Sequence, residues 1–545
     1  MSKLKLHFLM LLFSSSLLLI FVSIVPVWAT TGVVDPERLL IQFGINPYHV
    51  SDQQLQNVKI AILDNGFGGY APEKELLPTS TQLVQLTQIP QGSTNHGLGM
   101  AQIVWALTGQ LPNGPSFYLV NTNGFSNFKA AVQYVIDQKM DIVLYSQVWP
   151  FGGNYDGNGF INALVTKAVQ AGVIWINAAG NYGYKVYNGY VIDTCDKSLR
   201  FENKFDEGSA TITLSWNDFT DDDSYNSSKD LDLFVYDENE KLVASSTYIQ
   251  RNEAPAPGKD PLLSSHAREV ITLQDLDKGI YKIKIKMKSN NFIPSDRLRI
   301  IIKDDREEAI SFVDHTNDGE IMPPADNPLA ITVGEGVKFS SIGPTADGRV
   351  KPDTIIQDAT VAFSNGMGTR GSSNAAAIFT GIVSVMKAYA PQLKIEHLRE
   401  LIRLNQQTRI SGVSVGVGVG AGYADLMECP SNEPIEPRLQ QLIPARGQLM
   451  MNRYDRHYVV ITREDPFFLP GPMSARISRA AQNDVIAYDL RTQRWSMISG
   501  SMVARVLRPP LVEFRKANNV VERPPRKNYL WKTPTPVELE KIFSQ

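Results

Sequence analysis

Cysteine is scarce in this chain, with only Cys195 and Cys429 among 545 residues. Two cysteines so far apart form at most one disulfide and are as readily two separate thiols, so the sequence predicts no disulfide framework. Nor do its cysteine, histidine and carboxylate residues show the spacing of a zinc site, which leaves zinc-dependent chemistry without support. We therefore expect no required cofactor.

A strong excess of charge is also absent. The 53 Lys and Arg residues nearly balance the 56 Asp and Glu residues, and the net charge is −3. Proteins that bind nucleic acid or membrane surfaces usually carry a basic surplus, so neither partner is expected on this ground. The hydrophobic share of 43% is ordinary for a globular protein. At this length the chain exceeds one compact core and should form two to four domains.

Apolar runs of membrane-spanning length are missing everywhere except at the N-terminus. Residues 1–29 open with Lys3 and Lys5, continue through an apolar run and end at Val27-Trp28-Ala29. This layout predicts a cleaved signal peptide and therefore a secreted or otherwise extracytoplasmic protein. The run is also long enough for an uncleaved membrane anchor, which is the alternative and the only expected contact with a membrane. Residues 30–57 follow as an N-terminal linker.

Short apolar runs alternate with helical patterns in residues 58–190 and again in residues 326–429. The alternation predicts an α/β fold with a doubly wound, mostly parallel sheet and helices on both faces. Continuous apolar strands agree, because both sheet faces are then covered. The expected strands are residues 58–63, 117–120, 142–145, 173–177 and 330–334, and the expected helices are residues 97–107, 128–138, 160–170, 375–389 and 395–404.

The pattern changes between these two parts, in residues 191–325. Residues 231–237 and 281–287 alternate apolar and polar side chains with period two, which is typical of half-exposed strands. We expect an antiparallel, β-sandwich-like domain inserted into the α/β domain. Residues 430–545 form a C-terminal extension with 18 Lys and Arg against 11 Asp and Glu, for which the sequence indicates no role.

Three polar residues stand out by their settings: Asp64 in Ile62-Leu63-Asp64-Asn65-Gly66, His96 in Asn95-His96-Gly97, and Ser373 in Gly371-Ser372-Ser373-Asn374-Ala375. A carboxylate, an imidazole and a hydroxyl are the groups needed to convert a weak alcohol into a nucleophile. Taken singly, each motif also fits a plain role. Asp64 suits a strand-end turn, and His96 and Ser373 suit helix caps.

Taken together, the motifs resemble those of the subtilase family of subtilisin-like serine proteases, whose triad also runs Asp, His, Ser along the chain. The family's His-Gly-x-x-x-Ala arrangement is matched at His96, Gly97 and Ala101. Its Gly-Thr-Ser-x-Ala-x-Pro motif is matched from Gly371, with Ser372 replacing Thr and Ala377 replacing Pro. The resemblance implies an exported serine endopeptidase that acts on proteins or peptides, with Asp64, His96 and Ser373 as its catalytic residues.

The resemblance extends to two further segments. Asn177-Ala178-Ala179-Gly180-Asn181 is similar to the family segment that ends in the oxyanion-hole asparagine, which would be Asn181. Ser146-Gln147-Val148 stands where relatives carry Ser-x-Gly, a strand that pairs with substrate and lines the primary specificity pocket. Val148 in place of Gly would narrow that pocket, so the side-chain preference stays open. The implied substrate-binding residues are Ser146, Gln147, Val148, Ala179 and Gly180.

Calcium is common in the family, but the sequence assigns no ligands for it and no other metal site. Asp221-Asp222-Asp223 fits a solvated acidic loop better than a calcium site. An alternative from another functional class is a subtilisin-shaped binding or scaffolding protein with weak or no catalysis. Val148, Ala377 and the long C-terminal extension favour that alternative, whereas the presence of every reacting group speaks against it.

Overall fold

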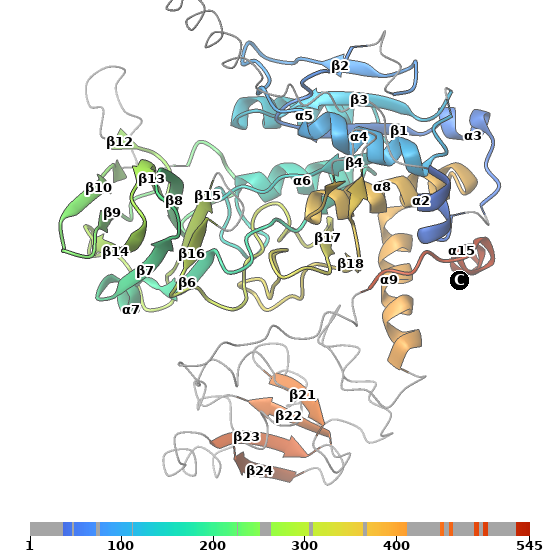
Figure 1. Cartoon of the computed structure of the whole chain (residues 1–545). Coiled ribbons are helices and arrows are strands. Elements are labelled where there is room, and N and C mark those ends of the chain that lie inside the picture. Colours follow the sequence, from blue (N-terminus) through green and yellow to red (C-terminus); the bar gives the residue numbers. More distant parts are fainter. Residues whose placement is uncertain are drawn as a thin grey trace, which may run out of the picture.

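The computed structural model describes residues 36–45, 48–71, 77–111, 113–225, 227–250, 263–304, 309–362, 368–410 and 530–544, together with four strands between residues 447 and 499 (Figure 1). The predicted signal peptide at residues 1–29 and Cys429 lie outside these ranges. Within them, no helix combines the length and the hydropathy needed to cross a membrane.

A seven-stranded parallel sheet forms the centre of the molecule, in the order β18-β17-β5-β4-β1-β3-β2. Parallel strands need crossover connections, and the helices between the strands supply them. All five strands expected from apolar runs are present within a few residues of their predicted bounds. The strands are β1 (Lys59–Asp64), β2 (Gln82–Val84), β3 (Ser116–Asn121), β4 (Ile142–Tyr145), β5 (Ile174–Ala178), β17 (Ile331–Glu335) and β18 (Thr354–Ile356).

Helices cover both faces of this sheet, which confirms the predicted doubly wound α/β class. On one face α4 (His96–Leu107) packs against α8 (Ser372–Tyr389), and both contact the central strands. On the other face α5 (Phe125–Asp137) packs against α6 (Phe160–Gln170). α9 (Ile395–Ile410) follows α8. Because α4 and α8 are buried on nearly all sides, their sequences are apolar rather than amphipathic.

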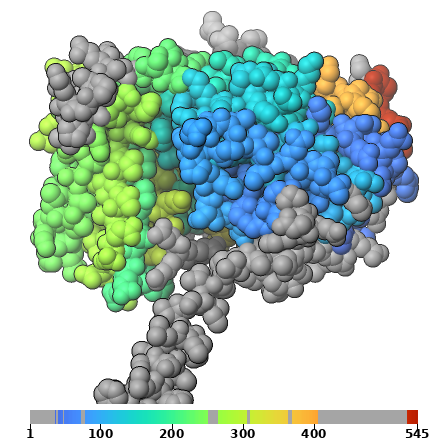
Figure 2. Space-filling view, turned by 90° about the horizontal axis from the view of Figure 1, so that it is seen from above, coloured from blue at the N-terminus to red at the C-terminus, as the bar shows by residue number. Residues whose placement is uncertain are grey.

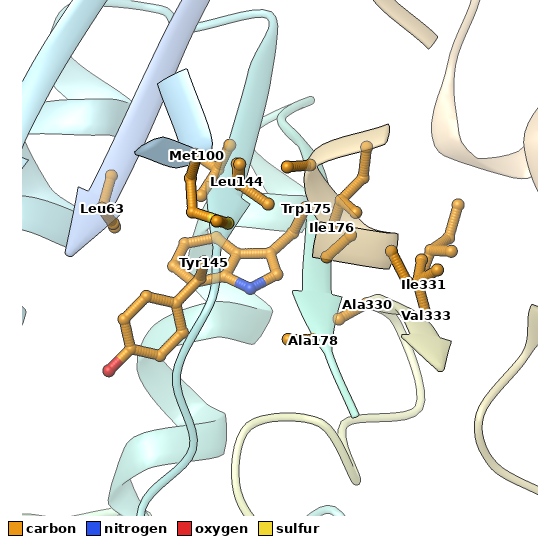
Figure 3. Packing of buried hydrophobic residues seen from close by; sticks show 14 of the residues in the cluster. Leu63, Met100, Leu144, Tyr145, Trp175, Ile176, Ala178, Ala330, Ile331 and Val333 are labelled. Atoms are coloured by element: carbon orange, nitrogen blue, oxygen red, sulfur yellow. The ribbon is translucent and has the colours of Figure 1, made fainter. Parts of the chain in front are cut away.

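Figure 3 shows the core of this domain, where side chains from the sheet meet α4. Trp175 on β5 is fully buried and lies near Tyr145 and Leu144 of the neighbouring strand β4 and Met100 of α4. Burying one such large side chain contributes about 1.5–3 kcal/mol relative to exposure. The packing therefore fixes the ends of β1, β4 and β5, from which the polar residues of the candidate site extend.

The inserted domain is an antiparallel β-sandwich, as predicted, and lies beside the parallel-sheet domain (Figures 1 and 2). One sheet runs β10-β9-β14-β7-β16 and the other β13-β8-β15-β6. The strands are β6 (Val186–Tyr190), β7 (Ser198–Asn203), β8 (Gly208–Trp216), β9 (Leu231–Tyr236), β10 (Leu242–Ser246), β13 (Arg268–Leu276), β14 (Gly279–Met287), β15 (Arg297–Asp304) and β16 (Ile310–Phe312), with two short strands β11 (Ile249–Gln250) and β12 (Leu263–Ser264) beside them.

Two details of the sandwich differ from the sequence analysis. β6 pairs with β15, so the sandwich begins before residue 191 and includes a strand that we assigned to the first α/β part. A short helix, α7 (Val191–Cys195), occurs where we expected no helical structure. β6 is neither a continuous apolar run nor a strict alternation, and α7, with five residues, is too short to show a helical period.

The two ends of the described chain pack on the parallel-sheet domain. Within residues 30–57, which we expected to be a linker, α2 (Pro36–Gln42) contacts α4 and α3 (Asp52–Gln56) contacts α8. At the other end, Trp531 packs edge-on against the buried ring of Phe379 in α8, with ring centroids 4.8 Å apart. α15 (Pro536–Phe543) follows and packs on α9.

Part of the C-terminal extension thus belongs to the structure of the parallel-sheet domain, and α15 buries Leu539 completely. Between α9 and this returning segment, the described residues also include an antiparallel sheet. Its strands are β21 (Gly447–Met451), β22 (His457–Ile461), β23 (Asp484–Asp489) and β24 (Arg494–Ser499). A separate two-stranded sheet, formed by β19 (Val361–Ala362) and β20 (Gly368–Thr369), occurs earlier in the chain.

Because α15 packs on the domain, substitutions on its buried side and on its exposed side should change the stability of the protein differently. Leu539→Ala should lower the free energy of unfolding by about 2–5 kcal/mol, because it leaves a cavity where a fully buried side chain packs. Val537→Ala on the same helix is the matched control, since Val537 is 62% exposed and its loss should cost less than about 0.5 kcal/mol. Urea titration measures both. Equal shifts would show that α15 does not dock.

Candidate active site

Asp64 is the last residue of β1 and is fully buried. A buried carboxylate is costly unless hydrogen bonds compensate it. Here Oδ1 accepts from the backbone N–H of Asn65 at 2.8 Å and from Nε2 of Gln147 at 3.4 Å. Oδ2 faces His96. The contact with Gln147 could not be predicted from the sequence, because it joins the ends of two neighbouring strands.

His96 is the first residue of α4 and is half-buried. Its Nδ1 lies 2.7 Å from Oδ2 of Asp64, so this nitrogen carries the proton that the carboxylate accepts. Nε2 is then left free to accept a proton. Gly97 permits the approach, because a Cβ there would lie 2.6 Å from Cβ of Asp64 and 2.4 Å from the ring of Phe67.

The charge on Asp64 controls the protonation of His96. Burial by itself lowers the pKa of the His96 imidazolium, but the negative charge of Asp64 and its hydrogen bond outweigh burial. The net effect raises the pKa of His96 above its usual 6.5. A base with a raised pKa holds an accepted proton more firmly.

Ser373 is the second residue of α8, so its backbone N–H is among the unpaired donors at a helix N-terminus. Its Oγ donates to the backbone carbonyl of Ser146 at 3.2 Å. Among the described residues this is the only hydrogen bond of Ser373 Oγ, and none reaches His96. Ser146 directly follows β4, whose Tyr145 pairs with Leu63 of β1, so the carbonyl lies beside the strand end that carries Asp64.

Asn181 follows β5 and is held by the residue before Ser373. Its Oδ1 accepts from both the backbone N–H and Oγ of Ser372, at 3.0 and 2.9 Å. The amide is thereby oriented, and its Nδ2 remains a free donor within the described structure. Gly371 is required here, because it has φ +132° and a Cβ would lie 2.8 Å from Asn181 Nδ2.

The segment Ser146–Val148 forms an edge beside Ser373. Asn177 donates through Nδ2 to the carbonyl of Gln147 at 3.2 Å, and the N–H of Trp149 donates to the carbonyl of Pro323 at 2.7 Å. In the described part of the chain, the backbone N–H and carbonyl of Val148 make no hydrogen bond. Both groups therefore lack a hydrogen-bond partner within the described structure. Ala179 and Gly180 directly follow β5, and the N–H of Gly180 donates to Oγ of Ser372 at 3.0 Å.

No group of three or more histidine, cysteine or carboxylate side chains is arranged to hold a metal ion within the described ranges. The acidic loop that we considered for calcium has other partners. Asp221 accepts from the N–H of Gly159 at 3.0 Å, and Asp223 forms an ion pair with Lys129 at 2.7 Å. Calcium therefore stays a prediction without assigned ligands.

The carboxyl ends of β1, β4 and β5 thus collect a carboxylate–imidazole pair, a hydroxyl at a helix N-terminus and an oriented amide, which are the kinds of group that a serine hydrolase uses. A family model described as the subtilase family matches residues 56–420. The chain belongs to this family. It is a serine-type peptidase, and its substrates are proteins or peptides.

Among solved structures, the chain is similar to the CspB protease of Clostridium perfringens, with 14% identity and a TM-score of 0.44 over 69% of this chain and 90% of that one. It is also similar to sphericase (15% identity, TM-score 0.32, 68% of this chain and 88% of that one). MycP1 from Mycobacterium smegmatis shows 13% identity and a TM-score of 0.30 over 69% and 81% of the two chains. A comparison with curated proteins found no match.

The Asp64–His96 pair predicts a titration that is measurable without substrate. The pKa of His96 should lie above 6.5 and should fall in Asp64→Asn, where burial continues to lower it but the carboxylate charge is lost. The pKa of His96 is higher in the folded protein than in the unfolded chain, so protonated His96 stabilises the folded state. This stabilisation is complete below pH 6.5 and is lost as the pH rises through the pKa of His96 in the folded protein. NMR of the imidazole measures the shift, and an unchanged pKa in the variant would contradict the pairing.

Proposed function

We propose that the protein is an exported serine endopeptidase that cleaves peptide bonds through a triad of Asp64, His96 and Ser373. The observation that carries the proposal is the 2.7 Å hydrogen bond between buried Asp64 and His96, at the same edge of the sheet as Ser373. Export is supported by the layout of residues 1–29.

In the proposed reaction, Ser373 Oγ turns from the carbonyl of Ser146 to Nε2 of His96 when substrate arrives. His96 accepts the proton of Oγ as that oxygen attacks the peptide carbonyl carbon, and Asp64 stabilises the resulting imidazolium. His96 then gives the proton to the leaving amine, and the C–N bond breaks to leave an acyl group on Ser373. Water, activated by the same imidazole, hydrolyses this ester and regenerates the hydroxyl.

Two donors would stabilise the negative oxygen of the tetrahedral intermediate. One is the backbone N–H of Ser373 at the N-terminus of α8, and the other is Nδ2 of Asn181. The fixed orientation of Asn181 supports this role, because a donor that is already aimed needs no reorganisation during the reaction. Ser372, which holds Oδ1 of Asn181 through two hydrogen bonds, is a positioning residue.

Endopeptidase activity, which is cleavage within a chain and not at its end, is supported by the backbone N–H and carbonyl of Val148, which make no hydrogen bond in the described structure. An extended peptide pairs with an unpaired strand edge through its backbone, independently of its termini. Ser146, Gln147 and Val148 on one side and Ala179 and Gly180 on the other would then flank the residue that donates the acyl group.

An activated Ser373 should react with a fluorophosphonate probe. We expect the purified wild-type protein to be labelled and Ser373→Ala to remain unlabelled. Ser384→Ala is the matched control on the same helix, since Ser384 Oγ donates only to its own helix, at the carbonyl of Thr380, and labelling should persist. Mass spectrometry locates the adduct. A folded wild type without an adduct would favour the binding or scaffolding alternative.

The proposed oxyanion donor predicts a specific kinetic defect. Asn181→Ala should lower kcat by about a hundred- to a thousandfold with little change in KM, which is the cost of losing one such donor in a protease of this family. Steady-state kinetics on a cleaved peptide tests this. If KM rises while kcat stays constant, Asn181 binds substrate and does not stabilise the intermediate.

A further inference from the structure

The side chain of the acyl-donating residue has a defined place in the proposed complex. The carbonyl carbon must reach Ser373 Oγ, which lies at the Ser146 carbonyl, and the carbonyl oxygen must reach Nδ2 of Asn181. The residue that carries this carbonyl therefore lies between the segment that follows Ser146 and the segment that precedes Asn181. Its side chain needs free space between Val148 and Gly180.

Two side chains of the protein narrow that space. A Cβ built on Gly180 would lie 3.4 Å from Cγ2 of Val148 and 3.3 Å from Cδ2 of Tyr182. Val148 and Tyr182 thus come within contact distance of the point where a Cβ of residue 180 would lie, and a substrate side chain would have to enter beside them. Val148 is β-branched and has few rotamers, so it cannot easily turn away.

The inserted sandwich contributes to the packing around these side chains. Val148 and Tyr182 pack on a cluster of Val186 from β6, Ile301 from β15, and Met322. Val148 also packs on a second cluster, whose members are Ala179, Ile321 and Ala325. Moving Val148 aside would disturb packing contributed by the sandwich, so the restriction is part of the fold.

Tyr182 is fixed through its backbone as well. Its N–H donates to Oγ of Ser341 at 3.0 Å, and the N–H of Ser341 donates to the carbonyl of Gly180 at 2.8 Å. These bonds tie the segment that contains Gly180 and Asn181 to one conformation.

We infer that the peptidase cleaves after glycine, and that Val148 and Tyr182 determine this specificity. The inference rests on the proposed serine endopeptidase function. Alanine is accepted less well, and leucine or phenylalanine at the acyl position is rejected by about a hundredfold or more in kcat/KM, since even one surplus methylene changes selectivity by about 10- to 200-fold.

The full-length protein should be tested with two probes, one that depends on the activation of Ser373 and one that also depends on the side-chain specificity. A small fluorophosphonate reports activation of Ser373 and needs no side-chain space, whereas a library of proteome-derived peptides reports which residue precedes each cleavage. Labelling together with cleavage after glycine supports the inference. If the protein is labelled but often cleaves after leucine or phenylalanine, or does not cleave after glycine, the inferred glycine specificity is wrong. The activation of Ser373 would still be supported. Absence of both labelling and cleavage overturns the proposed function and the inference together.

Variants of Val148 test the cause. V148G should raise the rate of cleavage after leucine relative to glycine by at least about tenfold, because it removes the side chain that narrows the space. V148I, the matched control, should keep the preference for glycine. If V148G does not fold, V148A shortens the same side chain and should move the ratio in the same direction. An unchanged ratio in a folded V148G or V148A would show that Val148 does not restrict the site.

Discussion

The structure of the site depends on the buried carboxylate of Asp64. A charge without solvent must be compensated locally, and the available donors are the backbone of Asn65, the side chain of Gln147 and the imidazole of His96. Each donor comes from a different place: the turn after β1, the end of β4 and the start of α4. Satisfying this carboxylate therefore aligns the strand ends and the helix that the proposed chemistry uses.

Among the described helices, the two most deeply buried each place one residue of the proposed triad at their N-terminus. α4 begins at His96 and α8 begins one residue before Ser373, and the helices pack on each other along one face of the sheet. Because both are fixed along their length by the core, their first residues have little freedom. The inserted sandwich and the returning C-terminal segment extend this packing, the first to the segment around Val148 and the second to Phe379 in α8.

The sequence predicted those parts of the molecule that local patterns determine. The central strands are continuous apolar runs, and His96 and Ser373 lie in motifs at helix starts. The contact of Gln147 with Asp64, the packing of Tyr182 and the docking of Trp531 could not be predicted, because they join segments that are far apart in the chain. One overlooked feature was local: Thr535 and Glu538 form a capping box that marks the start of α15.

The central claim is that Ser373, His96 and Asn181 act on one carbonyl group. The most direct test is a crystal structure of the protein after reaction with a fluorophosphonate. We predict a phosphorus–oxygen bond to Ser373, with a phosphonyl oxygen within hydrogen-bond distance of both Nδ2 of Asn181 and the Ser373 N–H, and with Nε2 of His96 beside the modified Oγ. An adduct on another residue, or a phosphonyl oxygen directed away from Asn181, would contradict the account.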